Sequence, residues 1–213
     1  MCARIVSVNV GQVRVVEWQS QKFPTGIFKT PVKGPVKVGT LGLRGDVQAD
    51  LTVHGGKEKA VYAYPSEHYE YWKDQLQVEL PFGMFGENLT TQGLLEESVH
   101  AGDSFRVGSA ELIVTQPRFP CYKLGMKFDS VEMVKRFQLS GRSGFYLAVL
   151  KEGQIAAGDQ IRTITPNLNA PTIAEIFVLQ SRMRKRALRG DLGSPEVGGV
   201  DRGEVGVEVN TTR

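Results

Sequence analysis

SFRVGSAELIVTQPRFPCYKL, residues 104–124, joins a strand pattern to an unusual loop. Apolar side chains alternate with other residues from Phe105 to Gly108-Ser109, and again from there to Val114. Alternation with a period of two on both sides of a two-residue, glycine-containing turn predicts a β-hairpin. Two prolines follow the second strand and stiffen the backbone, so the hairpin is expected to end in a rigid loop.

The segments on both sides of this hairpin have a similar character. Short Val- and Ile-rich stretches occupy residues 3–18 and 144–164, and apolar residues recur at helical spacing in residues 65–76 and 130–139. The pattern at 144–164 predicts a second hairpin, joined around Glu152-Gly153. Short strands with helices between them predict a mainly β, α+β fold whose core is a mixed β-barrel or a strongly bent sheet.

The 213 residues are expected to form three regions. Residues 1–165 form the β-barrel domain, residues 166–190 a short C-terminal helical appendage, and residues 191–213 a Gly-rich, charged tail. Thr172 and Glu175 have the spacing of a capping box, in which each side chain satisfies a backbone amide of the first helical turn. A helix is therefore predicted to begin there.

Composition excludes several classes of protein. Lys and Arg number 26 against 23 Asp and Glu, and a net charge of +3 is too small to indicate nucleic-acid binding. No segment approaches the about 18 uninterrupted apolar residues of a membrane span, and the N-terminus lacks a secretory pattern. Two cysteines in a chain of this length are typical of a reducing compartment. We therefore expect a cytoplasmic protein with neither a nucleic-acid nor a membrane partner.

Cys121 is the first candidate for chemistry. Arg118 precedes it by three residues and Lys123 follows it by two. Cationic neighbours favour the thiolate, which is both the nucleophile and the metal ligand. The pattern fits covalent catalysis, sulfur carriage or ligation of a soft metal. It equally fits an inert structural cysteine, because cysteine is among the most buried residue types.

Two other segments offer groups that bind anions. Residues 42–59, GLRGDVQADLTVHGGKEK, combine glycines with basic residues, and residues 85–89, FGENL, place an acid and an amide in a loop. Backbone amides at glycines and cationic side chains together suit an anionic ligand. Ordinary surface turns have the same composition, so the residues alone leave both possibilities open.

In this order and spacing, the segments 42–59, 85–89 and 116–124 (QPRFPCYKL) resemble the motifs of the MOSC domain family, which is named for the C-terminal domain of molybdenum cofactor sulfurases. The resemblance is greatest to the YiiM-like bacterial branch and covers about residues 1–165, with the motifs within 28–165. It implies a mixed β-barrel that binds a molybdenum cofactor, Mo-molybdopterin, beside the motif cysteine. YiiM-like members end in a three-helix domain, whereas this chain passes from one predicted helix into its Gly-rich tail.

The resemblance also implies roles for particular residues. Cys121 would be the metal ligand and the catalytic residue, and the substrate would be a small N-hydroxylated compound such as a hydroxylaminopurine-like base. Two cysteines cannot hold a four-cysteine iron–sulfur cluster, so we expect a separate electron-donor protein. One alternative is a sulfur carrier or cofactor-handling protein with a persulfide on Cys121, and another is a non-catalytic anion-binding module. The expected cofactor-binding residues are Arg44, His54, Gly55, Gly56, Lys57, Asn88, Arg118 and Lys123.

Overall fold

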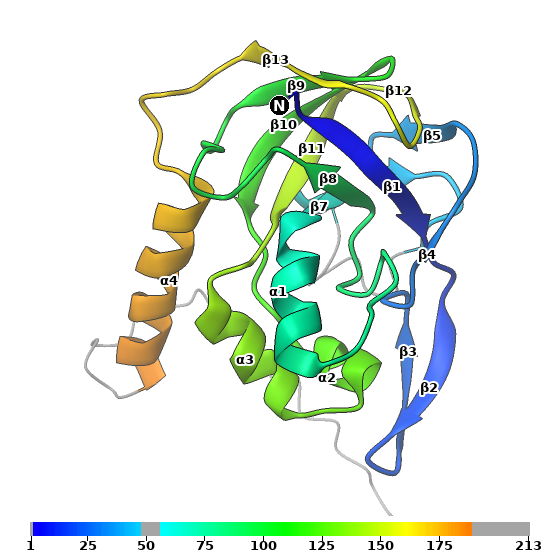
Figure 1. Ribbon diagram of the computed structural model, residues 1–213, viewed down its shortest axis with the longest axis vertical. Helices are drawn as coiled ribbons and strands as arrows, with labels where there is room; N and C mark the ends of the chain where they lie inside the picture. The colour runs from blue at the N-terminus through cyan, green and yellow to red at the C-terminus, as the bar shows by residue number, and fades with distance from the viewer. Residues whose placement is uncertain (1, 48–55, 189–213) are drawn as a thin grey trace, which may run out of the picture. The chain divides into compact units, whose positions relative to one another are not determined.

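An eight-stranded sheet dominates the computed structural model, which describes residues 2–47 and 56–188 (Figure 1). All neighbouring strands run antiparallel except one central parallel pair, β7 with β8. In spatial order the strands are β13 (Ile161–Thr165), β9 (Ser104–Val107), β10 (Ala110–Pro117), β11 (Phe145–Lys151), β7 (Val61–Pro65), β8 (Leu89–Gln92), β1 (Arg4–Val10) and β4 (Thr30–Pro31).

The first predicted hairpin is confirmed. β9 and β10 pair antiparallel, with Ala110 opposite Val107 across the predicted turn. Gly108 has a φ of 57° in that turn, and a Cβ there would collide with the carbonyl oxygen of Gln154. The turn therefore requires glycine for both its backbone conformation and its close contact.

The second predicted hairpin is wrong. β11 pairs with β10 and β7, while β13 pairs with β9, so the two strands are not neighbours in the sheet. The residues around Glu152-Gly153 instead lead into β12 (Gly153–Ile155), which joins β5 (Val36–Gly39) and β6 (Gly42–Leu43) in a three-stranded sheet. Local alternation cannot distinguish between these partners, because pairing over long sequence separations depends on the whole fold.

The large sheet is strongly bent but is not a closed barrel. Near its start β1 approaches the segment before β13, where the Ile5 amide donates to Asp159 O (2.9 Å) and the Gly158 amide donates to Ile5 O (2.8 Å). Within the described residues, the β pairing there is one isolated bridge, Arg4 to Gln160, and not a continuous ladder between β1 and β13. The α+β class is confirmed, and the expected closed barrel is an open, curved sheet.

Three helices lie together beside one end of the sheet in Figure 1: α1 (Glu67–Leu76), α2 (Tyr122–Phe128) and α3 (Glu132–Ser140). A hairpin of β2 (Arg14–Trp18) and β3 (Gln21–Thr25) and the short 3₁₀ helix η1 (Lys57–Lys59) complete this part of the fold. Among the described residues, no helix is long and apolar enough to span a membrane.

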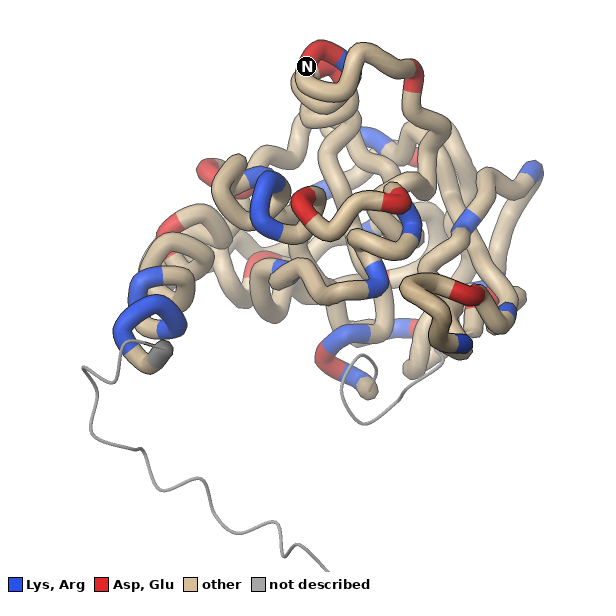
Figure 2. The backbone as a smooth tube through the Cα atoms, turned by 90° about the horizontal axis from the view of Figure 1, so that it is seen from below, with Lys and Arg blue, Asp and Glu red and all other residues tan. Residues whose placement is uncertain are grey.

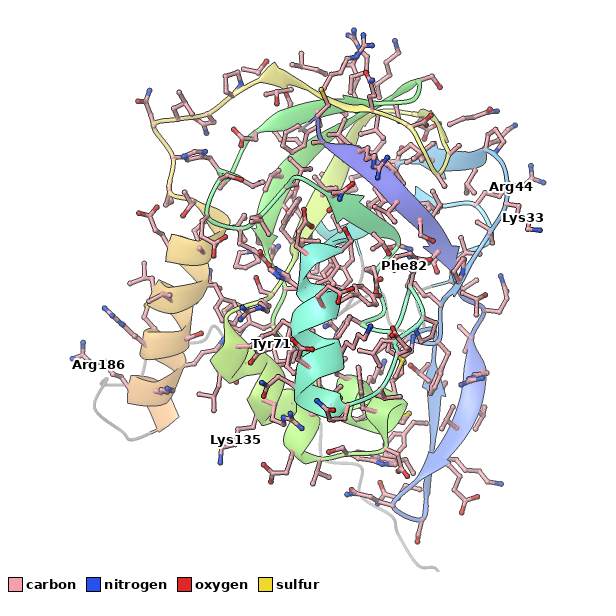
Figure 3. All side chains as sticks on the ribbon, viewed as in Figure 1. Lys33, Arg44, Tyr71, Phe82, Lys135 and Arg186 are labelled. Carbon is pink, nitrogen blue, oxygen red and sulfur yellow. The ribbon has the colours of Figure 1, made fainter. Side chains whose placement is uncertain are left out.

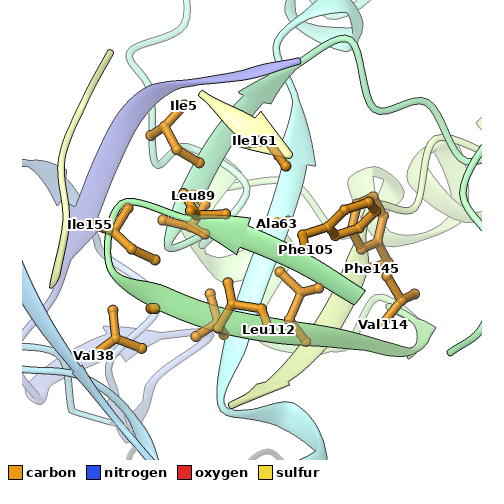
Figure 4. Close-up of a cluster of buried hydrophobic side chains, with 14 of the residues drawn as sticks. Ile5, Val38, Ala63, Leu89, Phe105, Leu112, Val114, Phe145, Ile155 and Ile161 are labelled. Atoms are coloured by element: carbon orange, nitrogen blue, oxygen red, sulfur yellow. The ribbon is translucent and has the colours of Figure 1, made fainter. Parts of the chain in front are cut away.

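Strand β7 is buried on both faces because it separates two cores. Val61 and Ala63 belong to a mainly aliphatic cluster inside the curved sheet, part of which Figure 4 shows. Tyr62 and Tyr64 point the opposite way, into an aromatic cluster shared with helices α1, α2 and α3. Each fully buried large side chain in such a cluster stabilises the fold by roughly 1.5–3 kcal/mol.

The predicted C-terminal helix is confirmed as α4 (Ile173–Leu188). The Glu175 amide donates to Thr172 Oγ1 (3.2 Å), and the Thr172 amide donates to Glu175 Oε2 (2.8 Å), which is the reciprocal pattern of a capping box. The chain up to Leu179 forms one compact unit, and Gln180 begins a second.

Candidate functional site

A cavity of about 100 Å³ brings the three motif segments together. Each segment contributes to its wall, and the chain between β3 and β4 contributes a fourth part that sequence reasoning did not consider. The motif residues that line it are Val47 and Lys59, then Gly86 and Asn88, then Arg118, Cys121 and Lys123. The fourth part is Thr25, Gly26, Ile27 and Lys29, and the tyrosines Tyr62 and Tyr146 complete the wall.

Cys121 occupies the N-cap position of helix α2 with an extended backbone (φ −125°, ψ 173°), and its side chain makes no capping hydrogen bond. Its side chain lines the cavity and is partly exposed, which is not the environment of a cysteine sealed in a core. Helix α2 was not predicted: it has seven residues and contains Gly125, where a Cβ would lie 3.0 Å from Ser130 O and 3.5 Å from the Trp18 side chain. Cys2, by contrast, is exposed near the chain terminus and lines none of the described cavities.

Arg118 is a buried cation, with only 6% of its surface exposed. Its guanidinium carbon lies 4.8 Å from the centroid of the Tyr62 ring and 5.5 Å from that of Phe137. Its Nη1 is buried and has no hydrogen-bond partner. A buried, unsatisfied donor on a cation is costly unless a ligand completes it, so this atom points to an anionic group in the cavity.

Lys29 is a second cation of the cavity that sequence reasoning missed. It forms an ion pair with Asp46, whose carboxylate also accepts Asn88 Nδ2 (2.9 Å) and the Gly11 amide (2.9 Å). Burial lowers the pKa of Lys29 in spite of this partner. The sequence signal was weak, because one lysine in a Pro- and Gly-rich stretch is typical of a solvated loop.

The FGENL motif now has a structural explanation. Glu87 is fully buried and accepts hydrogen bonds from the Gly83 amide (2.7 Å), the Phe85 amide (3.1 Å) and the hydroxyls of Tyr69 and Thr90. Gly86 has a φ of 80°, and a Cβ on it would lie 2.8 Å from Ile27 Cγ1. The acid therefore holds the loop, and the glycine allows the chain before β4 to approach it.

Asn88 uses its side chain to join parts of the cavity wall. Its Oδ1 accepts the Tyr62 amide (3.1 Å), and its Nδ2 donates to Asp46 and, at 3.4 Å, to Asn9 O. Only 2% of its surface is exposed. Asn88 thus fixes the relative positions of β7, β8 and the Asp46–Lys29 pair, and these contacts occupy both ends of its amide.

Five expected residues are not placed at the cavity: three lie elsewhere, and two fall outside the described residues. Arg44 is exposed and lines a different hollow beside β5 and β12; Figure 3 shows it extending outward near Lys33. Lys57 is exposed in η1, and it is Lys59, two residues later, that lines the cavity. Gly56 has a φ of 95° and does not line the cavity, and no described atom lies within 4 Å of a Cβ built on it. His54 and Gly55 lie outside the described residues.

Two tyrosines of the wall stand close to Arg118. The rings of Tyr62 and Tyr146 are 5.4 Å apart, and Tyr62 Oη donates to Ser143 O (2.9 Å). Burial raises the pKa of Tyr146, although the nearby Arg118 guanidinium opposes this shift. Both phenols therefore keep their protons at neutral pH, and Tyr146 is available as a hydrogen-bond donor in the cavity.

Comparison with known proteins identifies the family of this chain. The model of the MOSC domain matches residues 50–162, more than half of the chain, and the chain belongs to the MOSC domain family. The uncharacterized protein YflK of Bacillus subtilis is 44% identical over 161 residues, which span 76% of this chain and 73% of that protein. The crystal structure of YiiM from Geobacillus stearothermophilus superposes with a TM-score of 0.72 at 37% identity and 87% coverage of both chains.

A third relative carries a functional name. A protein of Gibberella moniliformis named "Reductase" is 38% identical over 141 residues, which span 64% of this chain and 25% of that protein. The likeness is therefore to one part of a longer protein.

MOSC domains are associated with molybdenum cofactor binding, and the side chains of the cavity wall are chemically suited to such a group. Among the described residues, no cluster of three or more His, Cys, Asp or Glu side chains could hold a metal ion by itself. The wall instead offers one thiol, several cations and the orphaned Arg118 Nη1. That donor set suits a metal whose other ligands come from an anionic organic cofactor.

Proposed function

We propose that this protein is a molybdenum-cofactor-dependent reductase of N-hydroxylated compounds. The observation that carries the proposal is the placement of the Cys121 thiol in one cavity with the buried, incompletely satisfied Arg118 and with Lys29, Lys59 and Lys123. A soft metal favours thiolate sulfur, and the phosphate and dithiolene of a molybdopterin need cations and amide donors.

The residues of the wall divide the binding task. Cys121 would ligate the metal, while Arg118, Lys123, Lys59 and Lys29 would hold the anionic parts of the cofactor. Asn88 would support the site indirectly, because its side-chain amide is already hydrogen-bonded to other residues of the cavity wall. Arg44 and Lys57, which do not line the cavity, have no place in this proposal.

The proposed reaction converts R–NHOH, two electrons and two protons into R–NH₂ and water. When bound, the cofactor would supply the two-electron centre for cleavage of the N–O bond. The protein would supply orientation and protons. Tyr146 Oη, whose pKa is raised by burial, stays protonated and would donate a hydrogen bond to a substrate bound in the cavity. A separate protein would donate the electrons, in a cytoplasmic, reducing setting.

The test uses full-length protein purified from molybdenum-replete cells. Molybdenum and pterin are measured per chain, and reduction of 6-hydroxylaminopurine is measured with reduced methyl viologen as donor. We expect the wild type to carry both and to turn over. Cys121→Ser should fold but lose at least about 100-fold in activity, because the metal loses its soft ligand. Cys2→Ala is the matched control and should behave as the wild type, since Cys2 is exposed and lines none of the described cavities.

Two results would contradict the proposal. Full activity in Cys121→Ser with molybdenum still bound would exclude Cys121 as the ligand. A wild-type chain that holds a persulfide on Cys121 and no molybdenum would be a sulfur carrier. Mass spectrometry of the intact protein, with and without a reductant, distinguishes these states.

A further inference from the structure

A second cavity, of about 150 Å³, shares Lys29 with the candidate site but contains none of its motif residues. It lies among strand β2, the segment leading into β4, the loop before Gly86, and helix α2. Besides Lys29, its wall includes Arg14, Phe28, Thr30, Met84 and Lys127. Three of these six side chains are cations and none is acidic.

Phe28 holds two of the cations in place. The Arg14 guanidinium carbon lies 3.4 Å from the centroid of the Phe28 ring, and Lys127 Nζ lies 5.7 Å from it. Lys127 Nζ also donates to the carbonyl oxygens of Ile27 (3.0 Å) and Gly83. These contacts fix the positions of the two charges, so the cost of ordering their long side chains is already met in the unliganded protein.

The charges around this cavity do not balance. The cations that face Lys127 are Arg14, Lys29 and Arg118, and the carboxylate that faces it is Glu87. Asp46 is paired with Lys29, and Glu87 is occupied by four donors of its own loop. Burial lowers the pKa of Lys127 to about 8, with the neighbouring cations acting in the same direction.

Outside this cavity and the candidate site, basic and acidic positions are interspersed along the backbone of the unit that ends at Leu179 (Figure 2). Counting Arg118 of the neighbouring cavity, four cations stand against two carboxylates, an excess of two positive charges in a partly desolvated place, which a dianion would neutralise.

We propose that the cavity beside Phe28 binds a phosphate group, between the guanidinium of Arg14 and the ammonium of Lys127. A guanidinium fork, two ammonium groups and the hydroxyl of Thr30 supply the donors that a tetrahedral dianion accepts. The phosphate could be free inorganic phosphate or the phosphate ester of a nucleotide. Neither form requires Cys121 or a metal, so this inference is independent of the proposed reductase activity.

The first experiment measures phosphate binding by isothermal titration calorimetry on the full-length chain. We expect Arg14→Gln and Lys127→Gln each to weaken binding by about tenfold or more, the usual effect of losing a charge-assisted hydrogen bond. Lys22→Gln is the matched control: it removes one charge from the same hairpin at an exposed position that does not line the cavity. Lys127→Gln removes two hydrogen bonds to backbone carbonyls and could prevent folding. Arg14 is exposed, so Arg14→Gln should fold and tests the site by itself.

A third variant locates the binding. Lys123→Gln changes only the cavity around Cys121 and should leave phosphate affinity within about twofold of the wild type, because Lys123 does not line the Phe28 cavity. Binding that is lost in Lys123→Gln and retained in Arg14→Gln would place the phosphate in the Cys121 cavity and overturn the inference. So would the absence of any phosphate binding in the wild type.

Sulfate gives an independent readout, because it does not titrate near neutral pH. An anion beside Lys127 raises the pKa of that ammonium, so binding at pH 8 should take up roughly half a proton at this site. Titrations in two buffers of different ionisation enthalpy measure this uptake. Arg14→Gln should reduce it together with affinity, and Lys127→Gln should abolish it. No proton uptake in the wild type would contradict the assignment of Lys127.

Finally, the source of the phosphate is tested with adenosine 5′-monophosphate, adenosine and inorganic phosphate. A nucleotide that binds at least about tenfold more tightly than phosphate, with no binding of the nucleoside, identifies a phosphate ester. Equal affinities for the nucleotide and phosphate identify the free ion. Binding of the nucleoside alone, unaffected by Arg14→Gln, would contradict the proposal.

Discussion

At the scale of single residues, Arg118 has two opposing effects. Its buried Nη1 lacks a partner, which destabilises the unliganded fold, and the same atom is what an anionic cofactor would use. We predict that Arg118→Met raises the free energy of unfolding of the cofactor-free protein by about 1 kcal/mol, since an apolar side chain replaces a buried cation with one unpaired donor. The same variant should retain little molybdenum.

Urea denaturation and metal analysis of the same preparations measure both effects. A loss of stability with unchanged metal content would show that Arg118 is structural. The faces of Tyr62 and Phe137 partly compensate the charge, so the stabilisation is expected to be modest.

Glu87, unlike Arg118, stabilises the unliganded fold. It accepts four hydrogen bonds in a fully buried loop, and a glutamine offers one oxygen and adds donors where only acceptors are useful. We predict that Glu87→Gln lowers the free energy of unfolding by about 2–4 kcal/mol. Glu132→Gln, at an exposed position in α3, should change it by less than about 0.5 kcal/mol. Equal effects in the two variants would show that the loop does not depend on the carboxylate.

At the scale of elements, close contact between β7 and the start of β11 positions the Arg118 loop. Gly144 has a φ of 62°, and a Cβ there would collide with Ala63 O and lie 2.8 Å from Tyr62 Cε2. The same residue accepts the Arg118 amide (3.3 Å) and donates to Glu96 Oε1 (2.6 Å). The backbone that carries Arg118 therefore depends on a position without a side chain.

Gly141 provides a matched control three residues earlier. Its φ is 71°, and nothing lies within 4 Å of a Cβ built on it. We predict that Gly141→Ala costs about 1 kcal/mol, from the left-handed backbone alone. Gly144→Ala should cost at least about 2 kcal/mol more, because the strands must separate. Thermal denaturation of both variants measures the difference, and similar melting temperatures would show that the contact can relax.

These elements show which parts of the fold and the site could be predicted from the sequence. The β9–β10 turn and the capping box of α4 are encoded within a few residues, and both were predicted correctly. The partners of β11 and β13 depend on pairings across many residues, and that prediction failed. The motif segments marked the cavity, but Lys29, Tyr62 and Tyr146 reach it only through strand order. In the sequence, the signal that could have identified Glu87 as structural was an acid placed between the apolar residues Phe85 and Leu89.

At the scale of the whole molecule, buried bases and buried phenols give the stability a particular dependence on pH. The folded-state pKa of Lys127 is about 8, below its ordinary value, and that of Lys29 is also lowered, in both cases by burial first. The unfolded chain therefore binds more protons than the folded one between about pH 8 and 10, so stability rises with pH there. Burial raises the pKa of Tyr62, Tyr64 and Tyr146, which reverses the slope above about pH 10.

We therefore predict that the free energy of unfolding rises by at most about 3 kcal/mol from pH 8 to pH 10 and then falls. Urea denaturation at half-unit steps of pH measures the curve. Lys127→Met should reduce the increase in unfolding free energy between pH 8 and pH 10, because the variant lacks the buried amine that titrates there. Lys22→Met, at an exposed position, is the control and should leave the curve unchanged. Saturating sulfate should also flatten it, since an anion beside Lys127 restores the pKa of the ammonium. A curve that falls steadily from pH 8 in the wild type would show that the lysines are not the buried bases described here.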